Sequence, residues 1–211
     1  MAIKRIYFVR HGETEGNVKR FLQFHDTPLT QQGHKGAEAI AQRLVHVEVD
    51  TLIASSFLRA QQTAGYISEV KKLPITTVES FHESMRPAAY RGLGMDSDEV
   101  LKFRADYRVN YWRGDWHEEG GENYFDVSKR VVESIEYLEE CEGQEIAVVS
   151  HGDFIRSITS YLLLQKDTDV VANKAVFTSL QLMSNAAITE FTFEDGMWKL
   201  FTWNDHAHFA E

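Results

Sequence analysis

Two short apolar runs, far apart in the chain, each end in a His-Gly pair, and this repetition constrains the fold more than any other feature. Residues 6–9 are followed by Arg10-His11-Gly12, and residues 146–149 by Ser150-His151-Gly152. Ligands gather at the ends of strands in α/β proteins, because the chain turns there and its backbone N–H groups become free to face an anion. We therefore expect two buried strands whose ends place two imidazoles in one pocket.

Strand-like and helix-like patterns alternate along the chain. Short apolar or β-branched runs, typical of strands, occupy residues 3–9, 51–54, 75–79 and 145–150. Apolar residues at helical spacing occupy residues 37–44, 60–67, 127–138 and 154–162. This alternation predicts an α/β fold of three layers, in which a mostly parallel sheet is flanked by helices.

Polar residues and glycines indicate where the predicted helices begin and end. Thr30 is a candidate N-cap for the first helix, and Ser55 or Ser56 for the second. Gly120-Gly121-Glu122 is expected to open the third helix and Gly143 to end it.

Two further segments complete the predicted architecture. Residues 187–193 and 197–203 alternate around Glu194-Asp195-Gly196, which predicts a three-residue hairpin and an antiparallel edge to the sheet. Segment 84–120 is irregular and rich in Arg, Tyr and Trp, with a short helix indicated by the spacing of Phe103, Tyr107 and Tyr111. We interpret it as an inserted cap region. Because no linker or repeat divides the chain, we predict one domain over residues 1–211.

Charge and cysteine content narrow the classes of function. The formal net charge of −10 argues against broad binding to nucleic acid or to anionic membranes, so any phosphate site must be a local cluster of cations. The single cysteine, Cys141, cannot form an intramolecular disulfide and is interpreted as an inert thiol at a helix end. Neither a secretory leader nor a membrane-spanning run is apparent, and we expect a cytoplasmic protein.

The motifs at the strand ends resemble those of the histidine phosphatase superfamily, also called the phosphoglycerate mutase-like family. They are spread over the chain as Arg10-His11-Gly12-Glu13-Thr14 with Asn17, Asp26-Thr27-Pro28-Leu29-Thr30 before Gly33, Ser55-Ser56 with Arg59-Ala60 and Thr63-Ala64, Glu83, Gly121-Glu122, Ser150-His151-Gly152, and the closing residues 203–208. A lone Arg-His-Gly would be weak evidence. Its place after the first strand, with matching motifs after the second and a late strand, argues against coincidence.

The resemblance implies a phosphoglycerate mutase-like fold and phosphoryl transfer through a phosphohistidine at His11. Such transfer depends mostly on positioning and on stabilisation of charge, for which Arg10, Arg59 and His151 supply cations. Arg59 falls in the first turn of its predicted helix, where the helix N-terminus adds partial positive charge. By resemblance, Asn17 and Gly152 also bind the phosphate. His11 must be neutral to attack, and the neighbouring cations push its pKa downward.

A carboxyl group must protonate the leaving alkoxide and later activate water. Glu83, just past the third predicted strand, matches the position that the family uses for this acid. Glu13 and Asp26 are its competitors, although Glu13 could pair with an arginine and Asp26 could shape the turn before Pro28. Thr14 and Glu122 could orient the pocket or merely cap helices, and Arg86 could add a cation or lie on the surface.

We expect neither a cofactor nor a metal. His206-x-His208 and His25-Asp26 resemble ligand pairs but lack third and fourth ligands at recognisable zinc-site spacing. Transfer through histidine needs no metal, because the cationic pocket takes the role that magnesium has in other enzymes.

The leading hypothesis is a metal-independent phosphatase that hydrolyses phosphate monoesters of small metabolites. A phosphoglycerate mutase-like phosphotransferase is the first alternative, and a non-catalytic sensor or scaffold that binds a phosphate ligand is the second. Acidic residues in or near the cap argue against a mutase, which favours a strongly basic mouth: Asp96, Asp98, Glu99, Asp115, Glu118 and Glu119. The edge hairpin could pair with a second copy to give a homodimer or be covered by its own chain.

Overall fold

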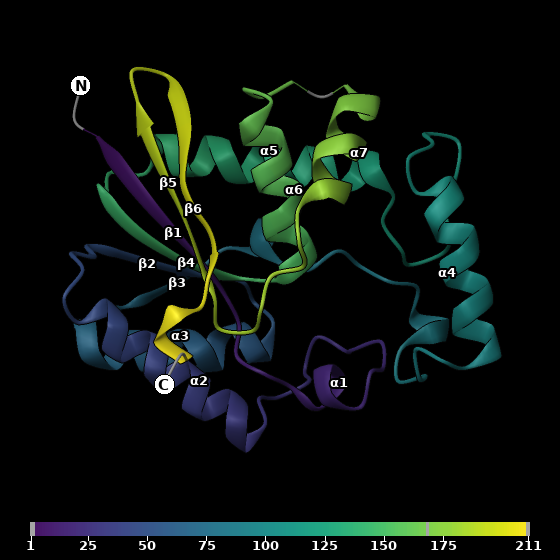
Figure 1. Cartoon of the computed structure of the whole chain (residues 1–211), viewed down its shortest axis with the longest axis horizontal. Coiled ribbons are helices and arrows are strands. Elements are labelled where there is room, and N and C mark those ends of the chain that lie inside the picture. The colour runs from purple at the N-terminus through teal and green to yellow at the C-terminus, as the bar shows by residue number, and fades with distance from the viewer. Residues whose placement is uncertain (1–2, 168, 210–211) are drawn as a thin grey trace.

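A mixed sheet forms the centre of the molecule, which is a computed structural model that describes residues 3–167 and 169–209 (Figure 1). The strand order is β3-β2-β4-β1-β5-β6. β1 pairs with β4, and β2 with both β4 and β3, in parallel, whereas β5 and β6 are antiparallel to their neighbours. The strands are β1 (Lys4–Arg10), β2 (Thr51–Ala54), β3 (Ile75–Thr77), β4 (Glu145–Ser150), β5 (Ile188–Glu194) and β6 (Met197–Asp205). The predicted fold class is confirmed.

Helices cover both faces of this sheet, and the alternation of side chains along β1 decides which face each residue joins. Ile6 and Phe8 pack with α5 and α6, whereas Tyr7 and Val9 pack with α2 and α3 on the other face (Figure 1). Because both faces are covered, the middle of β1 is almost wholly buried and reads as a continuous apolar run. The helices are α1 (Glu15–Val18), α2 (Gln31–Leu44), α3 (Leu58–Lys71), α4 (Asp98–Asn110), α5 (Tyr124–Glu140), α6 (Gly152–Leu163) and α7 (Val170–Ser179).

The N-cap predicted for α2 is confirmed, whereas both N-caps predicted for α3 are wrong. Thr30 does cap α2, since its hydroxyl accepts from the Gly33 N–H at 2.9 Å. At α3, however, Phe57 occupies the N-cap and offers no side-chain bond. Ser56 instead donates to the carboxylate of Glu79 at 2.6 Å, and Ser55 is bound to a histidine described below.

Other boundaries also shift by a few residues. α5 starts at Tyr124, not at the predicted glycines, because Asn123 and Asp126 form a capping box. It ends at Glu140, three residues before Gly143. β3 stops at Thr77, and a 3₁₀ turn follows at Glu79–Phe81. The hairpin has a two-residue turn, not three, because Asp195 and Gly196 both have positive φ (50° and 79°), as a tight hairpin turn requires.

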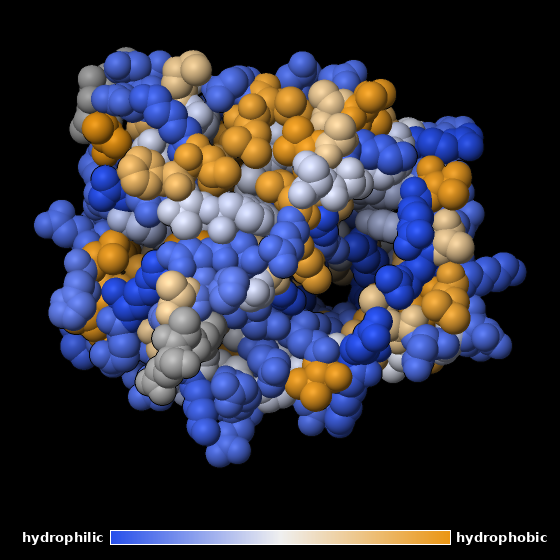
Figure 2. Space-filling view, in the orientation of Figure 1, coloured by the Kyte–Doolittle hydropathy of each residue, from blue (hydrophilic) through white to orange (hydrophobic). Residues whose placement is uncertain are grey.

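The predicted cap segment contains α4, which begins at the N-cap Ser97 and carries Phe103 and Tyr107 on one face. The α4 helix stands apart from the sheet in Figure 1, and Figure 2 shows a hollow between it and the rest of the molecule. α1 and α7 were not predicted. Within the residues that the structure describes, no helix is long and apolar enough to cross a bilayer.

Candidate active site

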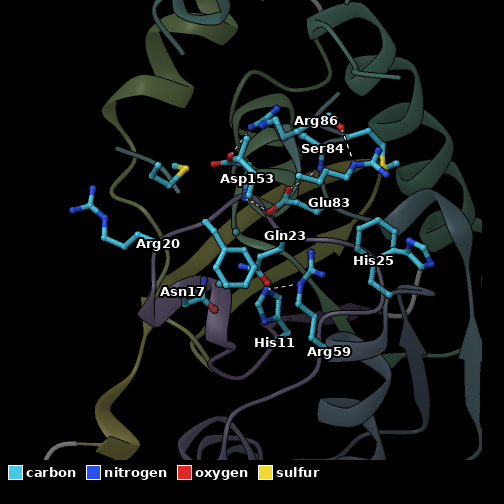
Figure 3. Close-up of a pocket in the computed structure, with 18 of the residues that line it drawn as sticks. His11, Asn17, Arg20, Gln23, His25, Arg59, Glu83, Ser84, Arg86 and Asp153 are labelled. Carbon is cyan, nitrogen blue, oxygen red and sulfur yellow. Dashed lines mark hydrogen bonds and ion pairs between the residues drawn. The ribbon is translucent and has the colours of Figure 1, made fainter. Parts of the chain in front are cut away.

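A cavity of about 290 Å³ opens at the carboxyl ends of β1 and β4 (Figure 3). The turn after β1, the loop over residues 20–25, the start of α3, the loop over residues 83–86 and the start of α6 all contribute to its wall. Of the predicted site residues, the wall contains Arg10, His11, Asn17, Arg59, Glu83 and Gly152. Segments that are distant in sequence therefore meet at one place, but of the two imidazoles expected in the pocket only that of His11 is among the described residues of the wall.

The hydrogen bonds of His11 fix how its ring is protonated. Its Nδ1 lies 2.7 Å from the Gly12 carbonyl oxygen, and its Nε2 lies 3.2 Å from Nε of Arg59. Because a carbonyl oxygen can only accept, Nδ1 carries the hydrogen and Nε2 keeps its lone pair. Burial, then the charges of Arg59 and Arg10, hold the pKa of His11 well below its usual value. The imidazole is therefore neutral near pH 7.

A close contact between two glycines positions the turn after His11. A Cβ on Gly12 would lie 2.4 Å from the Gly33 carbonyl oxygen, and a Cβ on Gly33 would lie 2.0 Å from the Glu13 carbonyl oxygen. Only glycine allows this approach between the turn and the first turn of α2. The Gly12 N–H also donates to the Thr63 hydroxyl on α3 at 3.0 Å.

The arginines beside His11 are held by backbone carbonyl groups. Arg59 donates to the Phe24 carbonyl at 3.0 Å, and Arg10 donates to that of Met183. Burial lowers the pKa of Arg59 to about 10, so its guanidinium stays charged at neutral pH. The Nε of Arg10 is buried and has no hydrogen-bond partner among the described residues.

His151 lies next to His11 but makes different contacts. The two ring centroids are 5.1 Å apart, and the Nε2 of His151 lies 2.8 Å from the Ser55 hydroxyl. Burial, followed by the charge of Arg59, holds the pKa of His151 well below its usual value. The ring is therefore neutral near pH 7, and the expectation that His151 supplies a cation was wrong. Its Nδ1 is buried without a partner in the described part of the chain. His151 itself is fully buried, and the neighbouring Gly152 forms the cavity wall at this strand end.

Glu83 faces His11 across the cavity (Figure 3). Its carboxylate accepts from the backbone N–H groups of Asp153 and Phe154 at 3.2 and 3.0 Å, at the N-terminus of α6, and from that of Ser84 at 2.8 Å. Burial, and then the charge of Asp153, raises the pKa of Glu83. A raised pKa suits a group that must hold a proton at near-neutral pH and then release it.

Glu122 fixes the loop that carries Glu83. Its carboxylate accepts from the Met85 N–H at 2.7 Å and binds Arg130 through two contacts of 2.9 and 2.8 Å. Arg130 in turn donates to the carbonyl oxygens of Ser80 and His82. Of the two readings left open for Glu122, the structure therefore favours the orienting one.

For Thr14 the structure favours the capping reading, because it forms a capping box with Asn17 at the start of α1. The side-chain oxygen of Asn17 also accepts from Asn185 at 3.1 Å.

The acids that compete with Glu83 lie elsewhere. The Glu13 carboxylate accepts from the Thr30 hydroxyl at 2.7 Å, and Asp26 is exposed. Neither is among the described residues that line the cavity, whereas Glu83 is. Across all the residues that the structure describes, no group of three or more His, Cys, Asp or Glu side chains is placed to hold a metal ion.

The wall also contains arginines that the sequence did not identify as site residues, together with Arg86, for which two roles had been left open. Arg20 and Arg91 line the cavity, and so does Arg86, which is bound to Asp153 at 3.0 Å and to the Tyr107 hydroxyl. Arg86 is thus part of the wall. The six acidic residues of the cap, by contrast, are absent from the wall as far as the described residues show. The expectation of an acidic mouth was therefore wrong, because the cap points its arginines inward.

Comparison with known proteins agrees with this geometry. A family model described as "Histidine phosphatase superfamily (branch 1)" matches residues 6–206. The chain belongs to the histidine phosphatase superfamily. Its relatives in this superfamily include proteins named as phosphatases and proteins named as phosphoglycerate mutases.

Individual superfamily members match over most of their length. A probable phosphatase of Schizosaccharomyces pombe is 26% identical over 97% of this chain and 94% of its own. A 2,3-bisphosphoglycerate-dependent phosphoglycerate mutase of Mesorhizobium japonicum is 29% identical over 74% of this chain and 79% of its own. The solved structure of a mycobacterial glucosyl-3-phosphoglycerate phosphatase with VO3 is 26% identical, has a TM-score of 0.77, and covers 95% of this chain and 98% of that one. Membership and fold together support phosphatase activity.

Proposed function

We propose that the protein is a metal-independent phosphatase that hydrolyses phosphate monoesters of small metabolites through a phosphohistidine at His11. The observation that carries this proposal is the protonation of His11. Nδ1 of His11 donates its hydrogen to the Gly12 carbonyl, which leaves the lone pair on Nε2. In the free protein that lone pair accepts from Nε of Arg59 at 3.2 Å, and the phosphate oxygens of a bound ester would take over this donor, in a cavity that also contains a carboxyl group. A module that only binds phosphate needs the cations but has no use for that carboxyl group.

In the first step, the Nε2 lone pair of His11 attacks phosphorus, and the bond from phosphorus to the leaving oxygen breaks. Protonated Glu83 gives its proton to that oxygen, so that a neutral alcohol leaves. Arg10 and Arg59 stabilise the charge on the phosphoryl oxygens, and the N–H groups of Asn17, Gly152 and the neutral His151 ring add uncharged donors.

In the second step, the Glu83 carboxylate takes a proton from water, and the resulting hydroxide attacks phosphorus. The P–N bond breaks, inorganic phosphate leaves, and His11 recovers its lone pair while Glu83 is protonated again. No step needs a metal, because the guanidinium groups supply the positive charge, and we expect full activity in the presence of a chelator.

The test is hydrolysis of p-nitrophenyl phosphate and a panel of metabolite phosphates, with and without a chelator. We expect released phosphate in both conditions and none with the His11→Ala variant. Loss of activity in chelator would refute the metal-independent mechanism, and unchanged hydrolysis by His11→Ala would remove His11 from its role.

A mutase is the second candidate, favoured by the basic wall that Arg20, Arg86 and Arg91 provide and by the mutases among the relatives. Incubation with 3-phosphoglycerate, followed by phosphorus NMR, separates the two activities. We expect inorganic phosphate to appear. Interconversion of phosphoglycerates without release of phosphate would establish the mutase instead.

We also propose a cytoplasmic location and no nucleic-acid partner, on the basis of the net charge of −10 and the single cysteine. The β6 edge, with Phe201 largely exposed, is where a second copy would pair. Sedimentation of the purified protein tests that homodimer.

A further inference from the structure

A second chamber, of about 330 Å³, lies next to the first cavity, between α4 and α7. We refer to it as the α4–α7 chamber. The two spaces share part of their walls: Leu22, Ser84, Arg86, Met95 and Asp153 line both. A ligand whose phosphate group lies at His11 could therefore extend into this chamber. In Figure 2 the hollow beside α4 has hydrophilic side chains around much of its rim.

The charges of the chamber wall are strongly one-sided. Arg104 and Arg108 come from α4 and Lys174 comes from α7, and no carboxylate of the described residues lies within ion-pairing distance of any of the three. Across both spaces, the cations are Arg10, Arg20, Arg59, Arg86, Arg91, Arg104, Arg108, Arg156 and Lys174, whereas the acids are Glu83 and Asp153. A chain with a net charge of −10 thus has an excess of positive charge around these two adjacent spaces.

Other cations of the wall are already fixed by the protein. Arg86 and Arg156 both bind Asp153, and their guanidinium groups lie over aromatic rings, 4.4 Å from the Tyr107 centroid and 4.1 Å from the Phe177 centroid. Both ion pairs therefore use Asp153, which is the one acid among the described residues of the chamber wall. Lys174 of α7 has a looser aromatic contact, with its Nζ 5.9 Å from the Trp112 ring centroid. Arg104, Arg108 and Lys174 therefore have no carboxylate partner among the described residues of the wall, and an anionic ligand would supply a counter-charge.

We propose that the α4–α7 chamber binds the leaving group of the substrate and that this leaving group carries an anionic group of its own, a carboxylate or a second phosphate. The inference rests on the proposed function, because it takes the first cavity as the place of phosphoryl transfer. Arg104, Arg108 and Lys174 act as specificity residues that bind the second anion, away from the reacting atoms. Phosphate esters of neutral alcohols would leave these charges unused.

Binding of unreactive phosphonates tests the proposal without requiring turnover. Calorimetry would compare straight-chain alkylphosphonates of two to six carbons with the same compounds ending in a carboxylate, and with those ending in a second phosphonate. We expect the terminal anion to improve Kd by about tenfold once the chain is long enough to reach the chamber. The terminal group, carboxylate or phosphonate, that gives the larger improvement in Kd identifies the anion that the leaving group carries. No gain at any length would overturn the proposal.

Variants test whether residues of the chamber cause the improvement in Kd that the terminal anion gives. In Arg104→Gln with Lys174→Gln, we expect the tenfold gain to fall to about twofold or less, while Kd for plain alkylphosphonates changes by less than about twofold. Lys102→Gln with Lys129→Gln is the matched control, because it also removes two positive charges, both at exposed residues outside the chamber wall. Equal weakening of charged and uncharged ligands, or an equal effect of the control, would contradict the assignment.

Hydrolysis of the corresponding phosphate esters separates this inference from the proposed function. A preference for ω-carboxylated esters, seen as a lower KM in wild type and lost in the double variant, supports both. If the phosphonates show the gain but no ester is hydrolysed, the phosphatase proposal fails and the anion site stands. If the esters are hydrolysed without preference, the phosphatase stands and the anion site fails.

Discussion

The two His-Gly strand ends look alike in the sequence, yet their rings have opposite contacts. At the end of β1, Nδ1 of His11 is bound to a backbone carbonyl and Nε2 faces an arginine side chain. At the end of β4, Nε2 of His151 is bound to the Ser55 hydroxyl, and Nδ1 is buried without a partner among the described residues. The same dipeptide at neighbouring strands therefore gives one ring poised for attack and one held beside it.

The difference arises from what surrounds each ring. The carbonyl that orients His11 belongs to the next residue, Gly12, whose position depends on its contact with Gly33. The hydroxyl bound to His151 belongs to Ser55, directly after β2 and far from His151 in the chain. A local contact thus fixes the nucleophile, and a long-range contact fixes its neighbour.

The largest effect should separate the two histidines. His11→Ala removes the proposed nucleophile, and we expect kcat to fall on the order of 10⁵-fold, whereas His151→Ala removes one stabilising group and should cost about 10²–10³-fold. Steady-state kinetics with p-nitrophenyl phosphate measures both. Equal losses in the two variants would mean that the rings do not have distinct roles.

Alanine substitutions at the two strand-end glycines, Gly12 and Gly152, should differ in their effect on the free energy of unfolding. A Cβ on Gly12 meets a backbone oxygen at 2.4 Å, so Gly12→Ala should lower the free energy of unfolding by about 3 kcal/mol or more. A Cβ on Gly152 meets only the Arg10 side chain, at 3.2 Å, and should cost about 1 kcal/mol or less. Urea unfolding of both variants is the measurement. A larger loss for Gly152→Ala would contradict the described packing.

Removal of the Ser55 hydroxyl should affect the imidazole of His151 and leave that of His11 unchanged. Ser55→Ala leaves Nε2 of buried His151 without its partner, which should cost about 1–3 kcal/mol of unfolding free energy. Nitrogen chemical shifts of the two imidazoles then report which ring responds. A shift at His11 as large as that at His151 would show that the rings are not held independently.

In acid the two histidines should behave alike. Both have folded-state pKa values below those of the unfolded chain, so the unfolded state binds more protons, and stability falls as pH drops below about 6.5. Each contributes up to about 1.4 kcal/mol per pH unit until its folded pKa is reached. His151→Gln should reduce this slope relative to wild type in denaturant titrations at several pH values. An unchanged slope would mean that His151 is already charged in the folded protein.

The sequence predicted most of the sheet and the meeting of its strand ends, because periodicity and motifs report local structure. Arg59 was expected in the first turn of its helix, and it lies there. The Ser55 contact escaped prediction, since a serine before a helix has the pattern of a cap and nothing local reveals a histidine from another strand. The catalytic roles of His11 and Glu83, and the single domain, stay predictions.

The second cavity wall could not be read from the sequence. The cap has many acidic residues, and composition alone indicated a mouth unsuited to anions, yet Arg104 and Arg108 of α4 line the second cavity. Lys174 belongs to α7, which was not predicted, and Arg20 lies in a loop without any periodic pattern. Tertiary packing decides which side chains of an irregular segment face the cavity. Local sequence patterns therefore do not reveal it.

The most direct test of the central claim is the site of phosphorylation during turnover. Protein mixed with excess p-nitrophenyl phosphate, quenched in alkali within milliseconds and digested, would be examined by mass spectrometry for a phosphate on nitrogen. The account predicts phosphohistidine at His11, in wild type and more abundantly in Glu83→Gln, where the attacking water lacks its base. Phosphate on any other residue, or turnover with no phosphorylated intermediate in either protein, would contradict it.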